Sequence, residues 1–141
     1  YWLSRHYFNK PLKYIGFGGT GKEVRDLLQV QDLAALIAKQ VRCLLKDKPV
    51  CRGEVFNVGG SSRVNLSLRE TTAICAELTG NSMKIGSVKE NRPADVIWYR
   101  TDNGRTERFF QWKPRRSARN ILEDTFHWLK DNEEDFKKLF A

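Results

Sequence analysis

The sequence is short of the residues from which metal sites and disulfide frameworks are built. It contains two histidines and three cysteines in 141 residues, and no two cysteines have C-x-x-C spacing. With an odd number of cysteines (Cys43, Cys51 and Cys75), neither a disulfide framework nor a zinc site is expected. His6 and His127 stand far apart in the sequence, so a metal site has little to build on. Cytoplasmic residence is the default expectation.

The sequence also lacks an apolar run long enough to cross a membrane, and it lacks a signal-like start. It shows no internal repeat and no low-complexity segment. A chain of this length suits one domain with a real core. We therefore expect a soluble globular domain over residues 1–141, with no membrane partner.

Acidic residues are in the minority. The chain has 25 Lys and Arg against 17 Asp and Glu, a formal net charge of +8. Such an excess favours anionic partners. The dense run "QWKPRRSAR" keeps a basic nucleic-acid-binding domain as an alternative, but no helix-turn-helix, zinc-finger or RNP-like aromatic pattern supports it. A solvated basic face is the commoner explanation, so nucleic acid is disfavoured as a partner.

Two nucleotide-binding patterns overlap in "YIGFGGTGKE", residues 14–23. Gly16, Gly18 and Gly21 match the dinucleotide pattern G-x-G-x-x-G. Gly16, Gly21 and Lys22 match the P-loop pattern G-x-x-x-x-G-K-[ST] except at its last position. A P-loop needs a hydroxyl after Lys22, where Glu23 stands. A dinucleotide fold needs a buried strand before the glycines and an acidic residue about 20 positions later. Neither context is present, so a glycine loop that joins two short strands is favoured.

Hydrophobic spacing and capping residues along the rest of the chain indicate an α/β fold. The expected elements are a helix over 1–9 before Pro11, short strands at 12–15 and 24–30, a helix over 31–47, a buried strand at 55–58, a helix from a Ser67–Glu70 capping box to Gly80, a strand at 83–88, and helices from Asp102 to Phe110, from Ser117 through Leu129 and over 132–140. Cys75 is expected in the core and not as a nucleophile.

The apolar run "VFNV", residues 55–58, is typical of a strand buried on both faces inside a parallel sheet. The chain offers few strands to pair with it. Most of the parallel sheet is therefore expected to be absent. An unpaired apolar strand is a template for pairing with another chain, so we expect a missing N-terminal half or self-association to cover it.

Four segments carry a family resemblance when they are taken in order: "GFGGTGKEVRDLLQVQDLA", "GEVFNVGG", "RPADVIWY" and "FFQWKPRRSARNILEDTFHWL". Together they resemble the C-terminal half of NAD-dependent nucleotide-sugar epimerases and dehydratases of the extended short-chain dehydrogenase/reductase family. Their wording is most similar to the CDP-paratose 2-epimerase (CDP-tyvelose epimerase) group. The resemblance covers essentially the whole chain. It implies the C-terminal, substrate-binding portion of an extended Rossmann-type epimerase.

The resemblance changes the interpretation of the glycine turn. In such enzymes the NAD fingerprint lies near the start of the full-length chain, and this turn is a hairpin that leads into the "VRD" strand at the sugar-nucleotide site. The catalytic Tyr-x-x-x-Lys pair and a nearby Ser or Thr also belong upstream and are absent here. We therefore expect no catalytic, NAD-binding or metal-binding residue in this chain. NAD would serve the full-length enzyme, oxidising a sugar carbon transiently before hydride returns to the other face.

What the resemblance assigns to this chain is binding. Arg25 in "VRD" matches the arginine that reaches the nucleotide part of the ligand. Arg92 in "RPAD" matches the arginine that holds the diphosphate, and Asp95 matches the acid that accepts from the ribose hydroxyls. The chemistry suits these roles, because a guanidinium offers a diphosphate a planar fork of donors and a carboxylate accepts from a diol. The implied ligand is a CDP- or UDP-sugar.

Two further possibilities stay open beside this one. The chain could be a free-standing binding or interaction module descended from that half, for example from a truncated reading frame, or the basic nucleic-acid-binding domain named above. Salt-dependent binding to random DNA would support the last of these. The sequence of the gene just upstream of Tyr1 would separate the first two.

Overall fold

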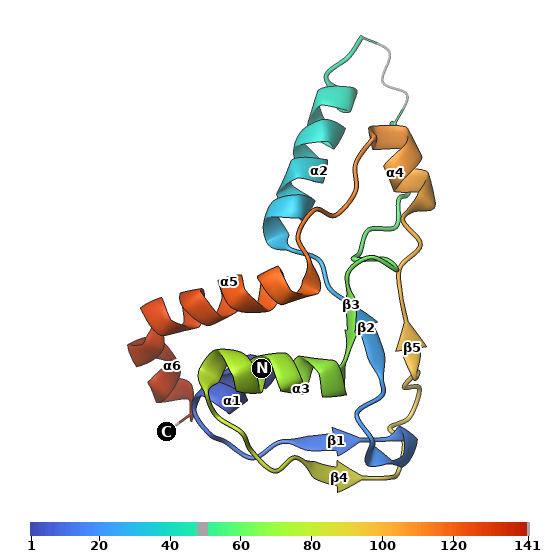
Figure 1. The fold of residues 1–141 in the computed structure, drawn as a ribbon. Helices are drawn as coiled ribbons and strands as arrows, with labels where there is room; N and C mark the ends of the chain where they lie inside the picture. The colour runs from blue at the N-terminus through green and yellow to red at the C-terminus, as the bar shows by residue number, and fades with distance from the viewer. Residues whose placement is uncertain (48–50, 141) are drawn as a thin grey trace. The chain divides into compact units, whose positions relative to one another are not determined.

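The computed structural model of the protein describes residues 1–47 and 51–140, and its chain divides into two compact units (Figure 1). The first, here called unit 1, comprises Tyr1–Arg25, Leu66–Tyr99 and Ala118–Ala141. The second, unit 2, comprises Asp26–Asn65 and Arg100–Ser117. The expectation of one domain over 1–141 does not anticipate this division.

Unit 1 has a helical core. Its helices are α1 (Trp2–Tyr7), α3 (Leu68–Thr79), α5 (Ala118–Asp131) and α6 (Glu133–Phe140). α1 packs against α3 and α5, and α3 packs against α5. The buried side chains at these contacts include Leu3, His6, Cys75, Leu122 and Leu129. Burial lowers the pKa of His6 and raises the pKa of the Cys75 thiol to about 12, so Cys75 is an inert core residue, as expected.

The ends of α3 follow local sequence rules. Ser67 and Glu70 form the predicted capping box, in which the Ser67 hydroxyl accepts from the Glu70 N–H at 3.2 Å and Glu70 accepts from the Ser67 N–H at 2.8 Å. Gly80 ends the helix in the left-handed region at φ 71°. The Glu70 carboxylate accepts from the Ser67 hydroxyl at 2.7 Å as well as from the Ser67 N–H, and these two hydrogen bonds lower its pKa. Both predicted caps are confirmed.

The strands are short and form two small sheets. β1 (Lys13–Ile15) pairs in parallel with β4 (Gly86–Val88), side by side in Figure 1. In the other sheet, of order β3-β2-β5, β2 (Val24–Asp26) pairs in parallel with β5 (Trp98–Tyr99), and β3 (Asn65–Ser67) lies on its other side. The predicted hairpin at the glycine turn is wrong, because β1 and β2 belong to different sheets; a short 3₁₀ turn, η1 (Phe17–Gly19), lies between them.

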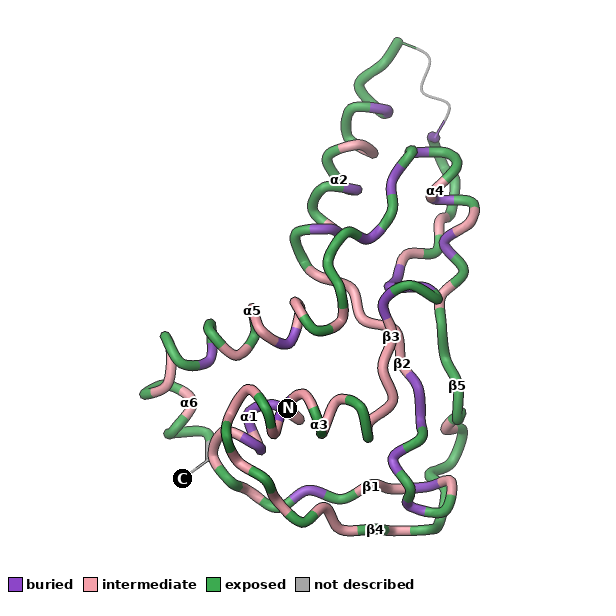
Figure 2. Tube along the Cα trace, in the orientation of Figure 1, coloured by how far each residue is buried: buried purple, intermediate pink, exposed green. Residues whose placement is uncertain are grey.

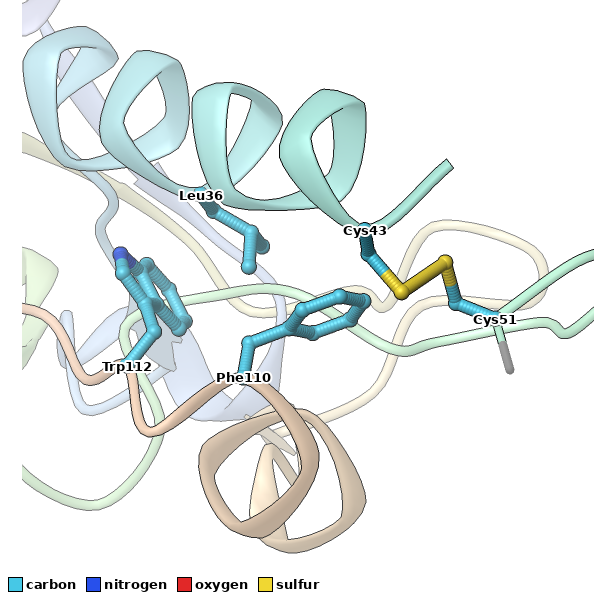
Figure 3. Close-up of a cluster of buried hydrophobic side chains, with 5 residues drawn as sticks. All are labelled: Leu36, Cys43, Cys51, Phe110 and Trp112. Carbon is cyan, nitrogen blue, oxygen red and sulfur yellow. A yellow bond between two sulfur atoms is a disulfide. The ribbon is translucent and has the colours of Figure 1, made fainter. Parts of the chain in front are cut away.

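Unit 2 is organised around α2 (Val30–Leu44), which is shorter than the helix predicted over 31–47, and around α4 (Gly104–Phe110). Its core consists of Leu36, Cys43, Cys51, Phe110 and Trp112, whose side chains converge in Figure 3. Cys43 and Cys51 form a disulfide, which corrects the sequence analysis, where the number and spacing of the cysteines suggested no disulfide framework. Such bonds persist mainly in oxidising compartments, so the disulfide does not support cytoplasmic residence. Cytoplasmic residence therefore stays a prediction. Most of α2 outside these positions is exposed (Figure 2).

The strand predicted at 55–58 is wrong. The segment is irregular, Val55 is 79% exposed, and the backbone of residues 55–59 is held by side chains from the next part of unit 2. Thr106 Oγ1 donates to Asn57 O at 2.6 Å, and Asn103 bonds both the N–H and the C=O of Gly59 at 2.9 and 2.6 Å. A strand needs a neighbouring strand for its N–H and C=O groups, and these side chains take that place.

Within residues 1–47 and 51–140, no helix is long and apolar enough to cross a membrane. The same residues contain no group of three or more His, Cys, Asp or Glu side chains that could hold a metal ion.

Candidate functional site

A cavity of about 320 Å³ lies within unit 1. Its walls come from α1, β1, the start of α3, the segment around β2 and the turn between β4 and β5. The lining residues are Tyr1, Trp2, Lys13, Ile15, Glu23, Arg25, Leu68, Arg92 and Asp95. All three residues predicted from the sequence as ligand-binding, Arg25, Arg92 and Asp95, are among them. The sheet and the turn therefore bring together residues separated by up to 70 positions in the chain.

Arg25 and Asp95 are bonded to each other. Arg25 Nη2 donates to Asp95 Oδ1 at 2.7 Å, and Arg25 Nη1 donates to Val24 O at 2.8 Å. The same Asp95 oxygen accepts from the Val96 N–H at 2.9 Å. The two side chains are 40% and 23% exposed, so the pair stabilises the fold by at most about 1 kcal/mol. A ligand can therefore compete with this pair at modest cost.

Arg92 and Lys13 supply the uncommitted positive charge of the cavity. Among the residues that the structure describes, neither forms an ion pair. Both are exposed at the cavity wall. The Arg92 carbonyl accepts from the Asp95 N–H at 3.3 Å, which fixes the turn that presents both side chains. Two free cations beside a neutralised Arg25–Asp95 pair favour an anionic ligand.

The glycine turn beside this cavity is filled by the protein itself. A Cβ at Gly19 would lie 2.0 Å from Ser87 Oγ, and one at Gly21 would lie 2.6 Å from the Tyr14 ring. The carbonyls of the turn also accept from the first N–H groups of α3, from Leu68 to Glu23 at 3.1 Å and from Arg69 to Gly21 at 2.8 Å. Only the 3₁₀ turn η1 begins within these glycines, so residues 14–29 lack the α-helix N-terminus that receives the pyrophosphate in a dinucleotide fold. The turn does not fit a dinucleotide.

The sequence did not predict a role for Glu23, which was noted only because it occupies the position where a P-loop requires Ser or Thr. Its side chain is 4% exposed, and neither carboxylate oxygen has a hydrogen-bond partner among the described residues. A signal was present in "KEVRD": side chains alternate along a strand, so Glu23 stands on the same side as Arg25. The same alternation places Lys13 with Ile15 on β1.

Unit 2 contains a second cavity, of about 340 Å³, lined among others by Arg63, Asp102, Asn103 and Glu107. Its polar groups are largely engaged within the fold. Arg63 is paired with Glu107, Asp102 accepts from the Gly104 N–H at 2.8 Å, and Asn103 holds Gly59. The unit 1 cavity is therefore the better candidate for a ligand.

No protein-family model matches the chain. Among solved structures, it is similar to an epimerase from Methanothermobacter thermautotrophicus (TM-score 0.78, 22% identity, 97% of this chain and 38% of that one). It is also similar to UDP-glucose 4-epimerase from Thermotoga maritima with UDP-glucose (TM-score 0.71, 21% identity, 93% and 38%) and to dTDP-glucose 4,6-dehydratase from Bacillus anthracis with NAD (TM-score 0.68, 25% identity, 94% and 38%). The fold is therefore that of the C-terminal part of Rossmann-type epimerases.

A curated protein extends this similarity to the sequence. CDP-paratose 2-epimerase from Salmonella typhi is 27% identical over 120 residues, which are 85% of this chain and 33% of that protein. The resemblance predicted from the motifs is thus confirmed: the chain matches the C-terminal portion of the NAD-dependent nucleotide-sugar epimerases and dehydratases. It spans about a third of the length of the curated relative and 38% of each of these three solved chains.

Proposed function

We propose that this chain is the nucleotide-sugar-binding portion of an NAD-dependent sugar-nucleotide epimerase, and that it is not catalytic alone. The observation that carries the proposal is the gathering of Arg25, Arg92 and Asp95 around one cavity in unit 1. In the whole enzyme, NAD would supply the redox chemistry. No residue of this chain is assigned to hold it, since the glycine turn does not fit a dinucleotide.

The ligand of the cavity is a CDP- or UDP-sugar in this proposal. Arg92, free of any ion pair in the described chain, holds the diphosphate together with Lys13. Arg25 and Asp95 exchange their mutual hydrogen bond for bonds to the nucleotide and its ribose hydroxyls. The exchange costs little because the pair is partly exposed. Similar solved structures support this ligand class, since the Thermotoga maritima epimerase holds UDP-glucose and a UDP-glucuronic acid 4-epimerase from Bacillus cereus holds UDP-glucuronic acid and NAD.

Calorimetric titration of the chain with UDP-glucose and CDP-glucose tests the assignment. Arg92→Ala removes a charge-assisted hydrogen-bonding group and should weaken binding by about 1.5 to 3 kcal/mol, roughly tenfold to a hundredfold in affinity. Arg69→Ala is the matched control, because Arg69 is an exposed arginine of unit 1 outside the cavity wall. Equal affinities in the two variants would place the site elsewhere. Saturable binding of NAD with a micromolar Kd would contradict the proposal that this chain holds no cofactor.

A protein partner is the second part of the proposal. β5 stands at the end of the sheet order β3-β2-β5. The apolar run that contains it is about half exposed: Val96 48%, Ile97 48%, Trp98 57% and Tyr99 56%. An apolar edge of this kind favours pairing with the remainder of a longer enzyme or with a second copy. Light scattering across a concentration series should show association. A monomer at high concentration would instead favour a free-standing module.

A further inference from the structure

The buried carboxylate of Glu23 has no partner that explains its position. It is 4% exposed, and both of its oxygens lack a hydrogen bond within residues 1–47 and 51–140. Burial of a carboxylate without a bonded partner is unfavourable; a glutamine would lower that cost, and an aliphatic side chain of similar size would avoid it. Because Glu23 lowers the stability of the folded state in this way, its presence is better explained by a function in ligand binding than by a contribution to stability.

The surroundings of Glu23 indicate a ligand. Glu23 lines the cavity that also contains Lys13 and Arg92, the two cations without an ion pair in the described chain. Its own carbonyl accepts from Leu68 N at 3.1 Å, so residue 23 lies at the N-terminus of α3, where the helix dipole favours negative charge. These positive charges lower the electrostatic cost of the carboxylate. They do not supply its missing hydrogen bonds.

We infer that Glu23 determines specificity by accepting hydrogen bonds from hydroxyl or amino groups of a bound glycosyl nucleotide. The inference rests on the proposed function. A ligand that satisfies this cavity must bring anionic oxygens for Arg92 and Lys13 and neutral donors for Glu23. A glycosyl nucleotide carries both. Inorganic pyrophosphate offers mainly acceptors, so it leaves Glu23 unbonded and repelled by a like charge. Glu23 thus selects for a sugar or base attached to the diphosphate.

The test compares UDP-glucose with inorganic pyrophosphate on the intact chain by calorimetry. In Glu23→Gln, which keeps the shape but loses the charge, affinity for UDP-glucose should fall about tenfold, because bonds to a charged acceptor are weakened. Affinity for pyrophosphate should rise, because the repulsion is gone. Glu90→Gln removes the same charge from an exposed residue outside the cavity wall and should change neither affinity.

Thermal unfolding separates this role from a structural one. Removal of an unbonded buried charge should leave the midpoint of Glu23→Gln unchanged or raise it, whereas a residue needed for the fold would lower it. A second variant, Glu23→Leu, removes all acceptor capacity and should lose UDP-glucose affinity further while it keeps pyrophosphate binding.

The outcomes distinguish the two proposals. If Arg92→Ala weakens both probes but Glu23→Gln leaves their affinity ratio unchanged, the inference is overturned and the proposed function stands. If Arg92→Ala affects neither probe, or neither probe binds the chain, the proposed function fails and the inference fails with it.

Discussion

Unit 1 and unit 2 differ in how the backbone N–H and C=O groups of their short extended segments are hydrogen-bonded. In unit 1 the segments pair as parallel strands, β1 with β4 and β2 with β5. In unit 2 no strand of the described residues pairs with residues 55–59, and Arg105, Thr106 and Asn103 bond the backbone of this segment. The difference shows that an apolar sequence run does not by itself make a strand, because the available neighbours decide whether it becomes one.

The largest effect is expected from Asn103→Ala in unit 2. It leaves the buried N–H and C=O of Gly59 unsatisfied and should lower the free energy of unfolding by about 2 to 4 kcal/mol. Asn65→Ala is the control, since Asn65 is only partly buried and its shorter hydrogen bond, to Ser62 O at 3.0 Å, is exposed; its cost should stay under about 1 kcal/mol. Urea denaturation measures both. Equal losses would mean that side chains do not replace a strand partner here.

A somewhat smaller effect is expected from the disulfide, which exists only in unit 2. The bridge spans a sequence separation of 8 residues, and its loss in Cys43→Ala/Cys51→Ala should cost about 2.5 kcal/mol through the entropy of the unfolded chain. A reducing agent should lower the stability of the wild type by a similar amount and leave the double variant unchanged. A wild type that does not respond to reductant would contradict the role given to this bond.

The smallest effect is expected from Ser67→Ala in unit 1. It removes the acceptor for the Glu70 N–H and one side of the capping box, at a cost of about 1 kcal/mol. Ser82, an exposed residue of the same unit, is the control, and Ser82→Ala should change stability by less than about 0.5 kcal/mol. A Ser67→Ala variant as stable as the control would show that tertiary packing, and not the cap, fixes the start of α3.

Local signals predicted most helix ends, although α4 begins at Gly104 with Asn103 as its N-cap and not with the expected cap Asp102. The caps of α3 and the end of α4 at Phe110 follow from residues within one turn of the helix end. The strand expected at 55–58 failed because strand formation depends on a partner remote in sequence. The Cys43–Cys51 bond was missed for a related reason, since the parity and spacing of three cysteines say nothing of which thiols meet in space.

The sequence anticipated that three residues would share one place in the fold, and their ligand roles stay a prediction. A motif resemblance pointed to Arg25, Arg92 and Asp95, which line one cavity. That Arg25 and Asp95 bond to each other depends on the fold that brings them together from 70 positions apart. Alternation in "KEVRD" could have placed Glu23 beside Arg25, but the burial of Glu23 without a hydrogen-bond partner among the described residues depends on the fold.

The division of the chain also sets an order in which its parts can form. Unit 2 is complete once residue 117 has been synthesised, whereas unit 1 still lacks its last stretch, which contains α5 and α6. The strand pairs of unit 1 join residues as far apart as Val24 and Trp98, and contacts of such separation form slowly. The whole sequence of unit 2 is therefore available earlier in translation than that of unit 1, whose α5 and α6 are made later.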